Sequence, residues 1–525
     1  WAFKGYVDVP FEVWDITNNR QLAVSFRDGL NNGYFEMNGW DGGTTSAREY
    51  IMIHDQTYDP AAPDPEIGVD NGAIVKMLYA IWGQLYAGQT WNQASIPATT
   101  IRINYGDKVT KYANFAPITD GYNQYAQTDQ YVHVDHHNIV IVPIDEATNK
   151  FWILNGNDGG VAISEDAGLT WREALSGGYN TTQFYGIDKK PGANEYVGGT
   201  QDNGTWLSPK GTPASWNSAY SRPIGGDGFD VSWHHTDPNK IIGGYQYNGF
   251  YRTTNGGTSW VSARTGLTDN GSGKGPFISK IGESNSDPEI IYTTGISGIW
   301  RSENFGGNWT KITPAGWSYN SLSTPVAISI ADPQIVWAGN AITNTSSTLF
   351  LSQDGGLTFT AAPRLSIAMG TITGIDTHPT DPNTAYLTFS IAGRAKVLKT
   401  TNLGQTWTDI TSFSNGSSTN GFPDVATYCV VVMPFNTNWI WVGTEIGLME
   451  SFDGGASWHL ADNGLPAVCI WDMKIVDNEV VVGTHGRGIF TVAVPQLAGY
   501  TPPVVTLSPF FVSASQNPGM VNVTA

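Results

Sequence analysis

The feature that most constrains the fold is an eight-residue motif that recurs along the chain. It begins with Ser or Thr, carries Asp or Asn at its third position and Gly at its fifth, and ends in Trp or Phe. Six copies begin at residues 164, 253, 302, 352, 400 and 451, and a degenerate seventh begins at 208. The steps between successive copies are 44, 45, 49, 50, 48 and 51 residues. A period of this length is typical of propellers and repeat arrays.

Each position of the motif has a structural role. The hydroxyl and the Asp or Asn side chain can accept backbone N–H groups inside a tight turn, and Gly supplies the positive φ that such turns need. The final aromatic residue offers a large apolar surface to a neighbouring sheet. The motif therefore predicts a turn followed by a strand, repeated once per sheet.

Between the copies, apolar strand-like runs alternate with turns that contain Asp, Asn, Pro or Gly. Eight sets of such runs begin near residues 138, 183, 229, 277, 325, 372, 425 and 469. They predict an all-β fold, a β-propeller of eight blades, or of seven if the first or last set lies outside the ring. The last set lacks the motif, so we expect it to borrow a fourth strand from the other end of the domain.

The residues outside the repeat divide the chain further. Strand-like runs at 21–27, 48–54 and 100–104 predict an N-terminal β-sandwich-like module over residues 1–115. The propeller is expected over 116–497, and 498–525 form a linker and the start of a further β module. Turns rich in Asp, Asn and Gly at 28–33, 64–66 and 70–72 can ligate calcium, but turn chemistry alone explains most clusters of this kind.

Composition narrows the class of partner. The net charge of −19 argues against a nucleic acid, and no apolar run is long enough for a membrane helix. The 61 Gly residues and the low charged fraction of 14% fit many short strands joined by tight turns. Because the chain opens at Trp1 without Met, we expect a processed or partial segment of a longer exported protein, extracellular or at the cell surface.

In a four-stranded blade, the turn between the second and third strands and the loop that enters the first strand open on the same end of the ring. Several charged or titratable residues fall in these loops. The candidates for this channel face are Asp135, His136, His137, Asp158, Asp202, Asp227, Glu445, His485 and Arg487.

These residues have three possible roles. Two of Asp158, Asp202 and Asp227 can form the pair of carboxylates that glycoside hydrolysis requires. The Asp and His side chains offer mixed oxygen and nitrogen ligands to a metal ion of unknown identity. Alternatively, the Asp residues only stabilise tight turns before Gly.

The motif resembles the Asp-box, or BNR, repeat, which in known proteins is a hairpin turn between the third and fourth strands of a propeller blade. Residues 132–494 resemble secreted propellers of the sortilin-like and xyloglucanase-like class, many of them labelled glycosyl hydrolases. That resemblance is carried by the segments 135–137, 157–160, 201–205, 226–228 and 483–488. The order of the modules also resembles cargo of the type IX secretion route.

The chain departs from these families in two respects. Sialidases with Asp boxes need an arginine triad and a Tyr/Glu nucleophile pair, and here only Ser221-Arg222-Pro223-Ile224 is similar, out of order. Xyloglucanases of this class have two tandem propellers, and this sequence predicts one. Both departures argue against hydrolase activity.

The sequence therefore favours a secreted or cell-surface binding or structural component, whose ligand is a carbohydrate or a surface protein. Four aromatic residues near the channel loops can stack on sugars, although core packing explains most of them; they are Trp206, Tyr245, Tyr247 and Trp471. The alternative is a glycoside hydrolase acting on a β-glucan-type polysaccharide through the paired carboxylates. A scaffold within a larger surface assembly is the third hypothesis.

Overall fold

The computed structural model describes residues 129–173 and 181–498 with short gaps at 146–147, 149, 167, 216–217, 285–286, 343–346, 366–368 and 463. It also describes positions 119 and 121 and eight further strands, β1–β7 and β40. The chain divides into two compact units, residues 1–175 and 176–525. The predicted boundary between 115 and 116 and the predicted calcium turns lie outside the described residues.

The N-terminal unit contains three antiparallel sheets. The first has the order β1-β4-β5 and the second β3-β2-β6-β7. Their strands are Ala2–Gly5 (β1), Phe11–Asp15 (β2), Arg20–Gln21 (β3), Phe35–Asn38 (β4), Tyr50–Ile53 (β5), Ile101–Tyr105 (β6) and Lys108–Tyr112 (β7). The third sheet holds the first motif copy and consists of His136–Asp145 (β8), Lys150–Asn157 (β9), Gly160–Ser164 (β10) and Arg172–Glu173 (β11).

Among its described residues, the second unit has seven sheets in chain order, apart from one small hairpin. The first three are Phe184–Lys189 (β12), Tyr196–Thr200 (β13), Gly204–Leu207 (β14) and Ser221–Ile224 (β15); Ser232–Trp233 (β16), Ile241–Tyr245 (β17), Gly249–Thr253 (β18) and Val261–Ser262 (β19); and Ile291–Gly295 (β20), Gly298–Ser302 (β21) and Thr310–Ile312 (β22). The third sheet has three strands, and a single bridge between Gly282 and Tyr292 stands in place of its innermost strand.

The remaining four sheets repeat the same antiparallel order. They are Val326–Ile328 (β23), Val336–Ile342 (β24), Ser347–Ser352 (β25) and Thr360–Ala361 (β26); Ile372–Thr377 (β27), Ala385–Phe389 (β28), Val397–Thr400 (β29) and Thr408–Asp409 (β30); Thr427–Val432 (β33), Ile440–Thr444 (β34), Gly447–Ser451 (β35) and His459–Leu460 (β36); and Ile470–Val476 (β37), Glu479–Thr484 (β38), Gly488–Ala493 (β39) and Val504–Leu507 (β40). The hairpin is Phe413–Ser414 (β31) with Ser417–Ser418 (β32), and a short helix, Pro495–Ala498 (α2), follows β39.

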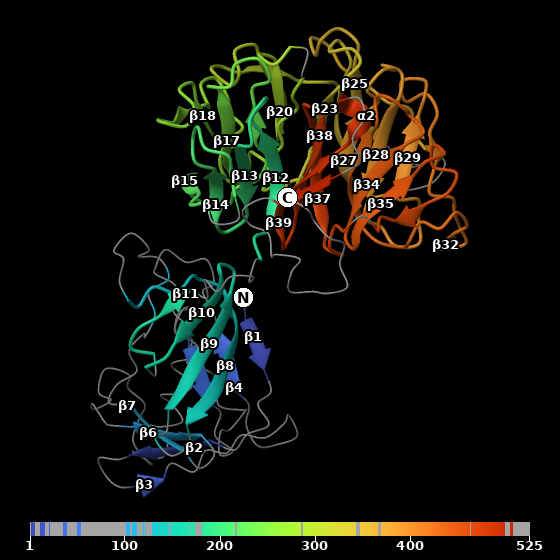
Figure 1. Ribbon diagram of the computed structural model, residues 1–525. Helices are drawn as coiled ribbons and strands as arrows, with labels where there is room; N and C mark the ends of the chain where they lie inside the picture. Colours follow the sequence, from blue (N-terminus) through green and yellow to red (C-terminus); the bar gives the residue numbers. More distant parts are fainter. Residues whose placement is uncertain are drawn as a thin grey trace. The chain divides into compact units, whose positions relative to one another are not determined.

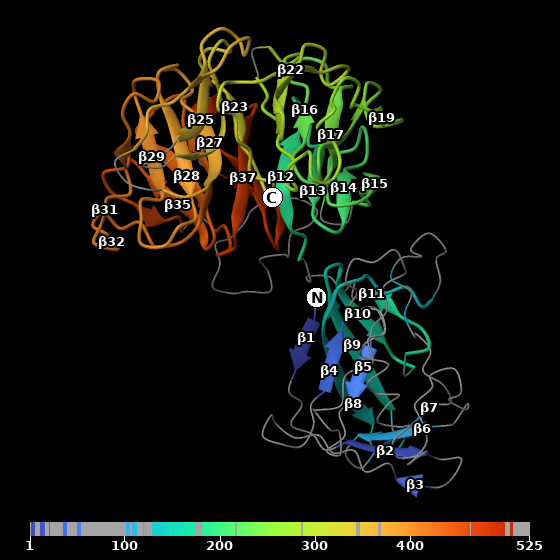
Figure 2. The same ribbon diagram turned by 180° about the vertical axis from the view of Figure 1, so that it is seen from behind.

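The seven sheets follow one another around a central axis, and β37 of the last lies against β12 of the first (Figures 1 and 2). The predicted β-propeller is therefore confirmed, with seven blades. The first of the eight predicted sets, β8–β11, belongs to the N-terminal unit. The expected strand exchange is wrong, because the fourth strand of the last sheet is β40, which follows directly in the chain.

The repeated motif forms the turn between the third and fourth strands of a sheet. In the copy at residue 352, the Ser352 hydroxyl donates to Asp354 Oδ1 at 2.7 Å and accepts the Gly356 N–H at 2.8 Å. The Asp354 carboxylate accepts the Thr358 N–H at 2.9 Å and its hydroxyl at 2.5 Å. The turn thus satisfies its own backbone with side chains, as the sequence predicts.

The aromatic residue that ends the motif packs between neighbouring sheets. Trp309 of the third sheet stacks on Phe250 of the second with ring centroids 6.0 Å apart, and its Nε1 donates to Ala263 O at 2.8 Å. Trp458 of the sixth sheet contacts Phe422 and donates to Ile410 O at 2.8 Å. The core is accordingly a series of apolar layers between sheets.

Aspartates on or near the inner strands join several sheets to their neighbours. Asp188 Oδ2 accepts the Trp233 N–H at 2.7 Å, and Asp376 Oδ2 accepts the Val430 N–H at 2.9 Å. Asp472 Oδ2 accepts the Ile187 N–H at 3.0 Å, which closes the ring between the last sheet and the first. These bonds satisfy N–H groups on the free edges of the inner strands.

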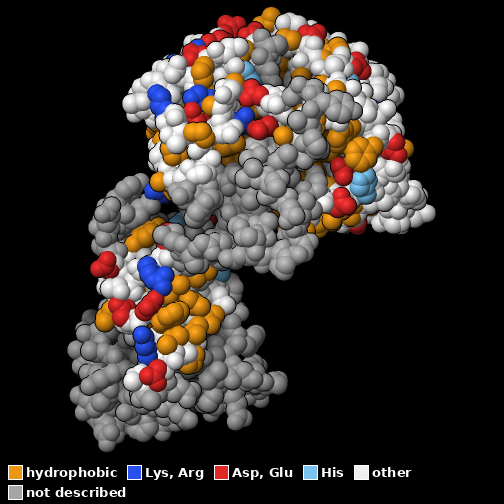
Figure 3. Space-filling view, viewed as in Figure 1, with side chains coloured by type: hydrophobic (Ala, Val, Ile, Leu, Met, Phe, Trp, Pro, Cys, Tyr) orange, Lys and Arg blue, Asp and Glu red, His pale blue; other side chains and the backbone are white. Residues whose placement is uncertain are grey.

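The surface of the propeller carries acidic and basic side chains interspersed with apolar ones (Figure 3). In the N-terminal unit, apolar side chains gather on strand β8, where Ile139, Val140, Ile141 and Ile144 are 44–48% exposed. Among the described residues, none of the helices has the length and apolar character that a membrane crossing requires.

Candidate functional site

The nine predicted channel-face residues are divided between the two units. Four of them lie in the N-terminal unit: Asp135 directly before β8, His136 and His137 at the start of β8, and Asp158 in the turn between β9 and β10. The other five lie in the propeller, on the first, second, sixth and seventh sheets, which are consecutive in the ring; they are Asp202, Asp227, Glu445, His485 and Arg487.

In the N-terminal unit, two of the predicted residues are in direct contact. The His137 ring nitrogen Nε2 pairs with Asp158 Oδ1, so the imidazole on β8 lies against the turn between β9 and β10. Asp135 precedes β8 in the left-handed region, at φ 58°, which an Asp tolerates better than most residues. This arrangement brings His137 and Asp158 together within the N-terminal unit.

In the propeller, Asp202 and Asp227 are neighbours on the first and second sheets. The Asp227 carboxylate accepts the Asp202 N–H at 3.0 Å, and the Asp227 N–H donates to Gln246 Oε1 at 3.0 Å. Asp202 lies in the β13–β14 turn at φ 61°. Both side chains are half-buried, and together they give this end of the ring a concentrated negative charge.

Glycines allow the loops of these two sheets to approach so closely. A Cβ on Gly199 would lie 2.0 Å from Phe229 O, and a Cβ on Gly228 would lie 2.3 Å from Gly204 O. Real side chains do not tolerate contacts this short, so any larger residue would push the two loops apart. The Gly-rich sequence around Asp202 and Asp227 is therefore explained by backbone contact between blades.

The sixth and seventh sheets contribute the remaining predicted residues. Glu445 and Arg487 are exposed in the turns β34–β35 and β38–β39. His485 is half-buried, and its backbone N–H donates to Cys469 O at 2.8 Å. Burial lowers the pKa of its imidazole to about 4. The ring is therefore neutral at pH 7.

A group of aromatic side chains lies beside these residues. Tyr185 contacts the rings of His485 and Trp471 at centroid distances of 4.9 and 4.4 Å, and Trp471 stacks on Tyr428 at 4.4 Å. The Tyr185 hydroxyl donates to Gln201 Oε1 at 2.8 Å, which places it next to the Asp202 turn. We call Tyr185, Tyr428 and Trp471 the aromatic platform; all three are half-buried.

The platform has a common local origin. Each of its residues is the second of an inner strand, where the pairing register with the next strand shifts by one residue. Such an irregularity interrupts the alternation of side chains between the two faces of the sheet, so that one side chain points in a different direction. The sequence identified Trp471 but missed Tyr185 and Tyr428; the signal was their equivalent positions at the start of three inner strands.

The propeller end thus combines two carboxylates with partly accessible aromatic rings. Aromatic faces present apolar surface on which a flat sugar ring can stack, while carboxylates can donate or accept protons. The other predicted aromatics, Trp206, Tyr245 and Tyr247, are also half-buried. This combination suits a polyhydroxylated ligand better than an anionic one, because the local charge is negative.

Two curated relatives match this chain. It is 24% identical over 336 residues to a xyloglucanase of Hypocrea jecorina, covering 61% of this chain and 36% of that protein. It is 27% identical over 199 residues to a probable oligoxyloglucan-reducing end-specific xyloglucanase of Neosartorya fischeri, covering 35% of this chain and 24% of the relative. The chain thus spans about a third or less of these relatives. No family model matches the sequence.

Several solved structures are similar in outline. An ancestral GH74 enzyme is 16% identical with a TM-score of 0.46, covering 60% of this chain and 45% of its own. The GH74 xyloglucanase of Xanthomonas campestris is 15% identical with a TM-score of 0.44, covering 76% and 56%. YCF48 of Cyanidioschyzon merolae is 15% identical with a TM-score of 0.41, covering 59% and 95%.

These relatives correct the functional prediction from the sequence. The prediction of a non-catalytic binding or structural component is contradicted, because the curated relatives are named as xyloglucanases. They favour the alternative, a glycoside hydrolase. The prediction had given too much weight to the absence of a second propeller from the sequence.

Proposed function

We propose that this chain is part of a glycoside hydrolase that acts on a β-glucan-type polysaccharide, with xyloglucan as the first substrate to test. The observation that carries the proposal is the alignment of 336 residues with a xyloglucanase. The aromatic platform beside Asp202 and Asp227 supports it, because the two features provide stacking surface and proton-transfer groups at one end of the ring.

We assign the proton-transfer roles to Asp202 and Asp227. Hydrolysis of a glycosidic bond needs one carboxyl group to protonate the leaving oxygen and a second to activate water or attack the anomeric carbon. Asp202 and Asp227 are the pair that the propeller itself brings together. Asp158, the third candidate from the sequence, is paired with His137 in the N-terminal unit.

The test measures reducing ends released from xyloglucan, mixed-linkage β-glucan and cellulose by the purified chain. We expect release from xyloglucan and a loss of about 100-fold or more in Asp202→Asn or Asp227→Asn, the scale of general acid–base catalysis. Asp287→Asn is the matched control, since Asp287 lies in the turn before β20 at the opposite end of the blade.

Two results would sink the assignment. The first is no release from any of the three polysaccharides by a folded chain. The second is full activity in both Asp202→Asn and Asp227→Asn. Trp471→Ala should raise KM with a smaller effect on kcat, because the platform binds the glycan and does not transfer protons.

We further propose that the protein works outside the cell, where a polymeric substrate is met, and that its repeat is an Asp box. The hydroxyl, carboxylate and Gly contacts of the motif support the second point. Export by the type IX route is a prediction from sequence resemblance alone.

A further inference from the structure

Within the propeller, a second cluster of titratable side chains begins three residues further along β12 than the aromatic platform. Asp188 is near the end of β12, whereas Tyr185 is near its start. His235 follows β16, and Glu283 precedes β20. Three consecutive sheets therefore each contribute one side chain to what we call the channel cluster, Asp188, His235 and Glu283.

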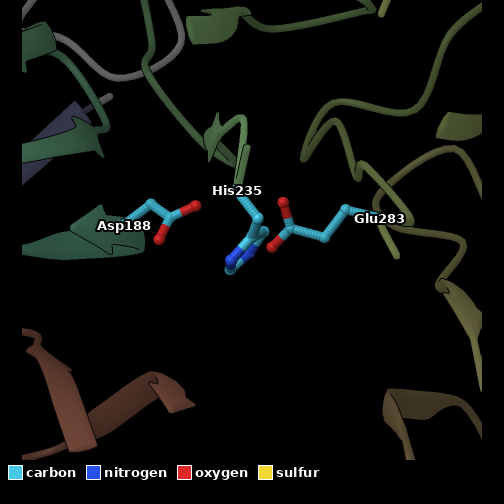
Figure 4. A group of neighbouring side chains, drawn as sticks. All are labelled: Asp188, His235 and Glu283. Carbon is cyan, nitrogen blue, oxygen red and sulfur yellow. The ribbon is translucent and has the colours of Figure 1, made fainter. Parts of the chain in front are cut away.

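The three side chains converge on one point. One ligand atom from each, a carboxylate oxygen or an imidazole nitrogen, lies within 4.8 Å of the others. Figure 4 shows the His235 ring between the carboxylates of Asp188 and Glu283. Ligand atoms around a tetrahedral ion at about 2.1 Å lie about 3.4 Å apart, so small side-chain rotations suffice to enclose one.

The two Asp188 oxygens accept the N–H groups of Lys189 and Trp233, but in the described part of the chain one carboxylate oxygen of Glu283 has no such donor. Asp188 is fully buried, and Glu283 Oε2 is buried without a hydrogen-bond partner among the described residues. Glu283 Oε1 accepts from Lys474 Nζ at 2.6 Å, which leaves the second oxygen free to face the imidazole. A buried carboxylate oxygen without a donor is costly, and it points to a missing ligand.

The charges around Lys474 also indicate a missing cation. Four carboxylates surround Lys474, those of Asp188, Asp230, Glu283 and Asp472. The Lys474 ammonium also donates to Val231 O at 3.0 Å, and it lies 3.6 Å from Asp188 Oδ2. Lys280 adds a second positive charge near Asp472, and a divalent cation would offset negative charge that the two ammonium groups leave.

We propose that the channel cluster binds one divalent transition-metal ion, with zinc as the best-fitting ion, through Asp188, His235 and Glu283. Two oxygen ligands and one imidazole nitrogen suit zinc and manganese, and they leave a fourth position for water. The ion would tie the first three sheets of the propeller together at the channel.

Lys474 sets the strength of the site. Its ammonium shares Glu283 and Asp188 with the ion, so it competes for the same oxygens. Replacing Lys474 by Met, which keeps the length and apolar stem of the side chain, is therefore expected to tighten zinc binding. A cluster that exists only as an ion pair with Lys474 would instead lose stability and gain no affinity for zinc.

The experiment titrates the full chain, stripped with a chelator, with zinc by calorimetry and with cobalt by visible absorption. Because His133, His136 and His137 can bind metal independently, the readout is the difference between the wild-type chain and His235→Gln. We expect one zinc equivalent fewer, or binding weaker by at least about tenfold, in His235→Gln and in Glu283→Gln. His459→Gln, which removes an exposed His beside a carboxylate, is the matched control.

A thermal scan provides the second readout, since an ion that binds only the folded state raises Tm with concentration. Zinc should raise the Tm of the wild-type chain and of His459→Gln but not that of His235→Gln. Equal stoichiometry, affinity and Tm response in the wild-type chain and His235→Gln would overturn the proposal. It would also fail if neither zinc nor manganese binds the wild-type chain.

Discussion

Replacing Asp376 by Asn should stabilise the propeller at neutral pH. Asp376 lies on β27, and burial raises the pKa of its carboxyl to about 7 from an ordinary value of 3.8, with Asp472 adding to the shift. The Val430 N–H and Lys280 act in the opposite direction but do not restore the ordinary pKa. Asn keeps an oxygen for the Val430 N–H and never ionises.

The magnitude follows from the two pKa values. Below about pH 4 the carboxyl is protonated in both the folded and the unfolded chain, so its ionisation does not change the free energy of unfolding. Between about pH 4 and about 7 the Asp376 carboxyl is ionised in the unfolded chain but protonated in the folded chain. The free energy of unfolding therefore falls by about 1.4 kcal/mol per pH unit. Above about pH 7 the loss is constant, at most about 4 kcal/mol.

The assay is urea unfolding of both proteins at pH 4, 6 and 8, followed by Trp fluorescence. We expect Asp376→Asn to match the wild-type chain near pH 4 and to exceed it progressively toward pH 8. A variant that is no more stable at pH 8, or an advantage that does not change with pH, would refute the reasoning. Asp354→Asn is the opposite control, because its carboxylate is stabilised by hydrogen bonds and its pKa is lowered to about 2.

Three further outcomes are expected. Asp354→Ala should cost about 1–3 kcal/mol of unfolding free energy at pH 7, measured in urea, because its turn hydrogen bonds are lost. This cost should shrink as the pH falls from about 4 toward about 2, because the unfolded wild-type carboxylate protonates in this range before the folded one does. Trp337→Ala should cost about 3–5 kcal/mol because the indole is fully buried between sheets, and a smaller loss would mean that the core collapses around the cavity. Gly199→Ala should displace the loop of Phe229 and reduce hydrolysis with the fold retained, whereas unchanged kinetics would show that the Asp202 and Asp227 loops tolerate separation.

Much of the fold was predictable because one turn motif repeats. Its hydroxyl, carboxylate and Gly act locally, so each copy marks a third and a fourth strand without knowledge of tertiary contacts. The assignment of strands to units was not predictable in this way. Strands β8–β11 carry the same motif as the ring, and only their contacts place them in the N-terminal unit.

The candidate site was predictable in part. Asp202 and Asp227 were found because Gly-rich turns at the same end of successive blades must lie close together. The aromatic platform depends on register shifts in three inner strands, which have no clear sequence signature. The channel cluster was missed because Asp188, His235 and Glu283 lie on or beside strands rather than in the loops that the sequence indicated.

The aspartates that link neighbouring sheets also bear on what can enter the channel. An inner strand with free N–H groups invites an extended peptide to add as a further strand, in solution or during aggregation. At Ile187, Trp233 and Val430 a carboxylate already accepts the N–H group. The channel wall is therefore protected against β-augmentation at these positions, and any ligand there must be recognised by side chains.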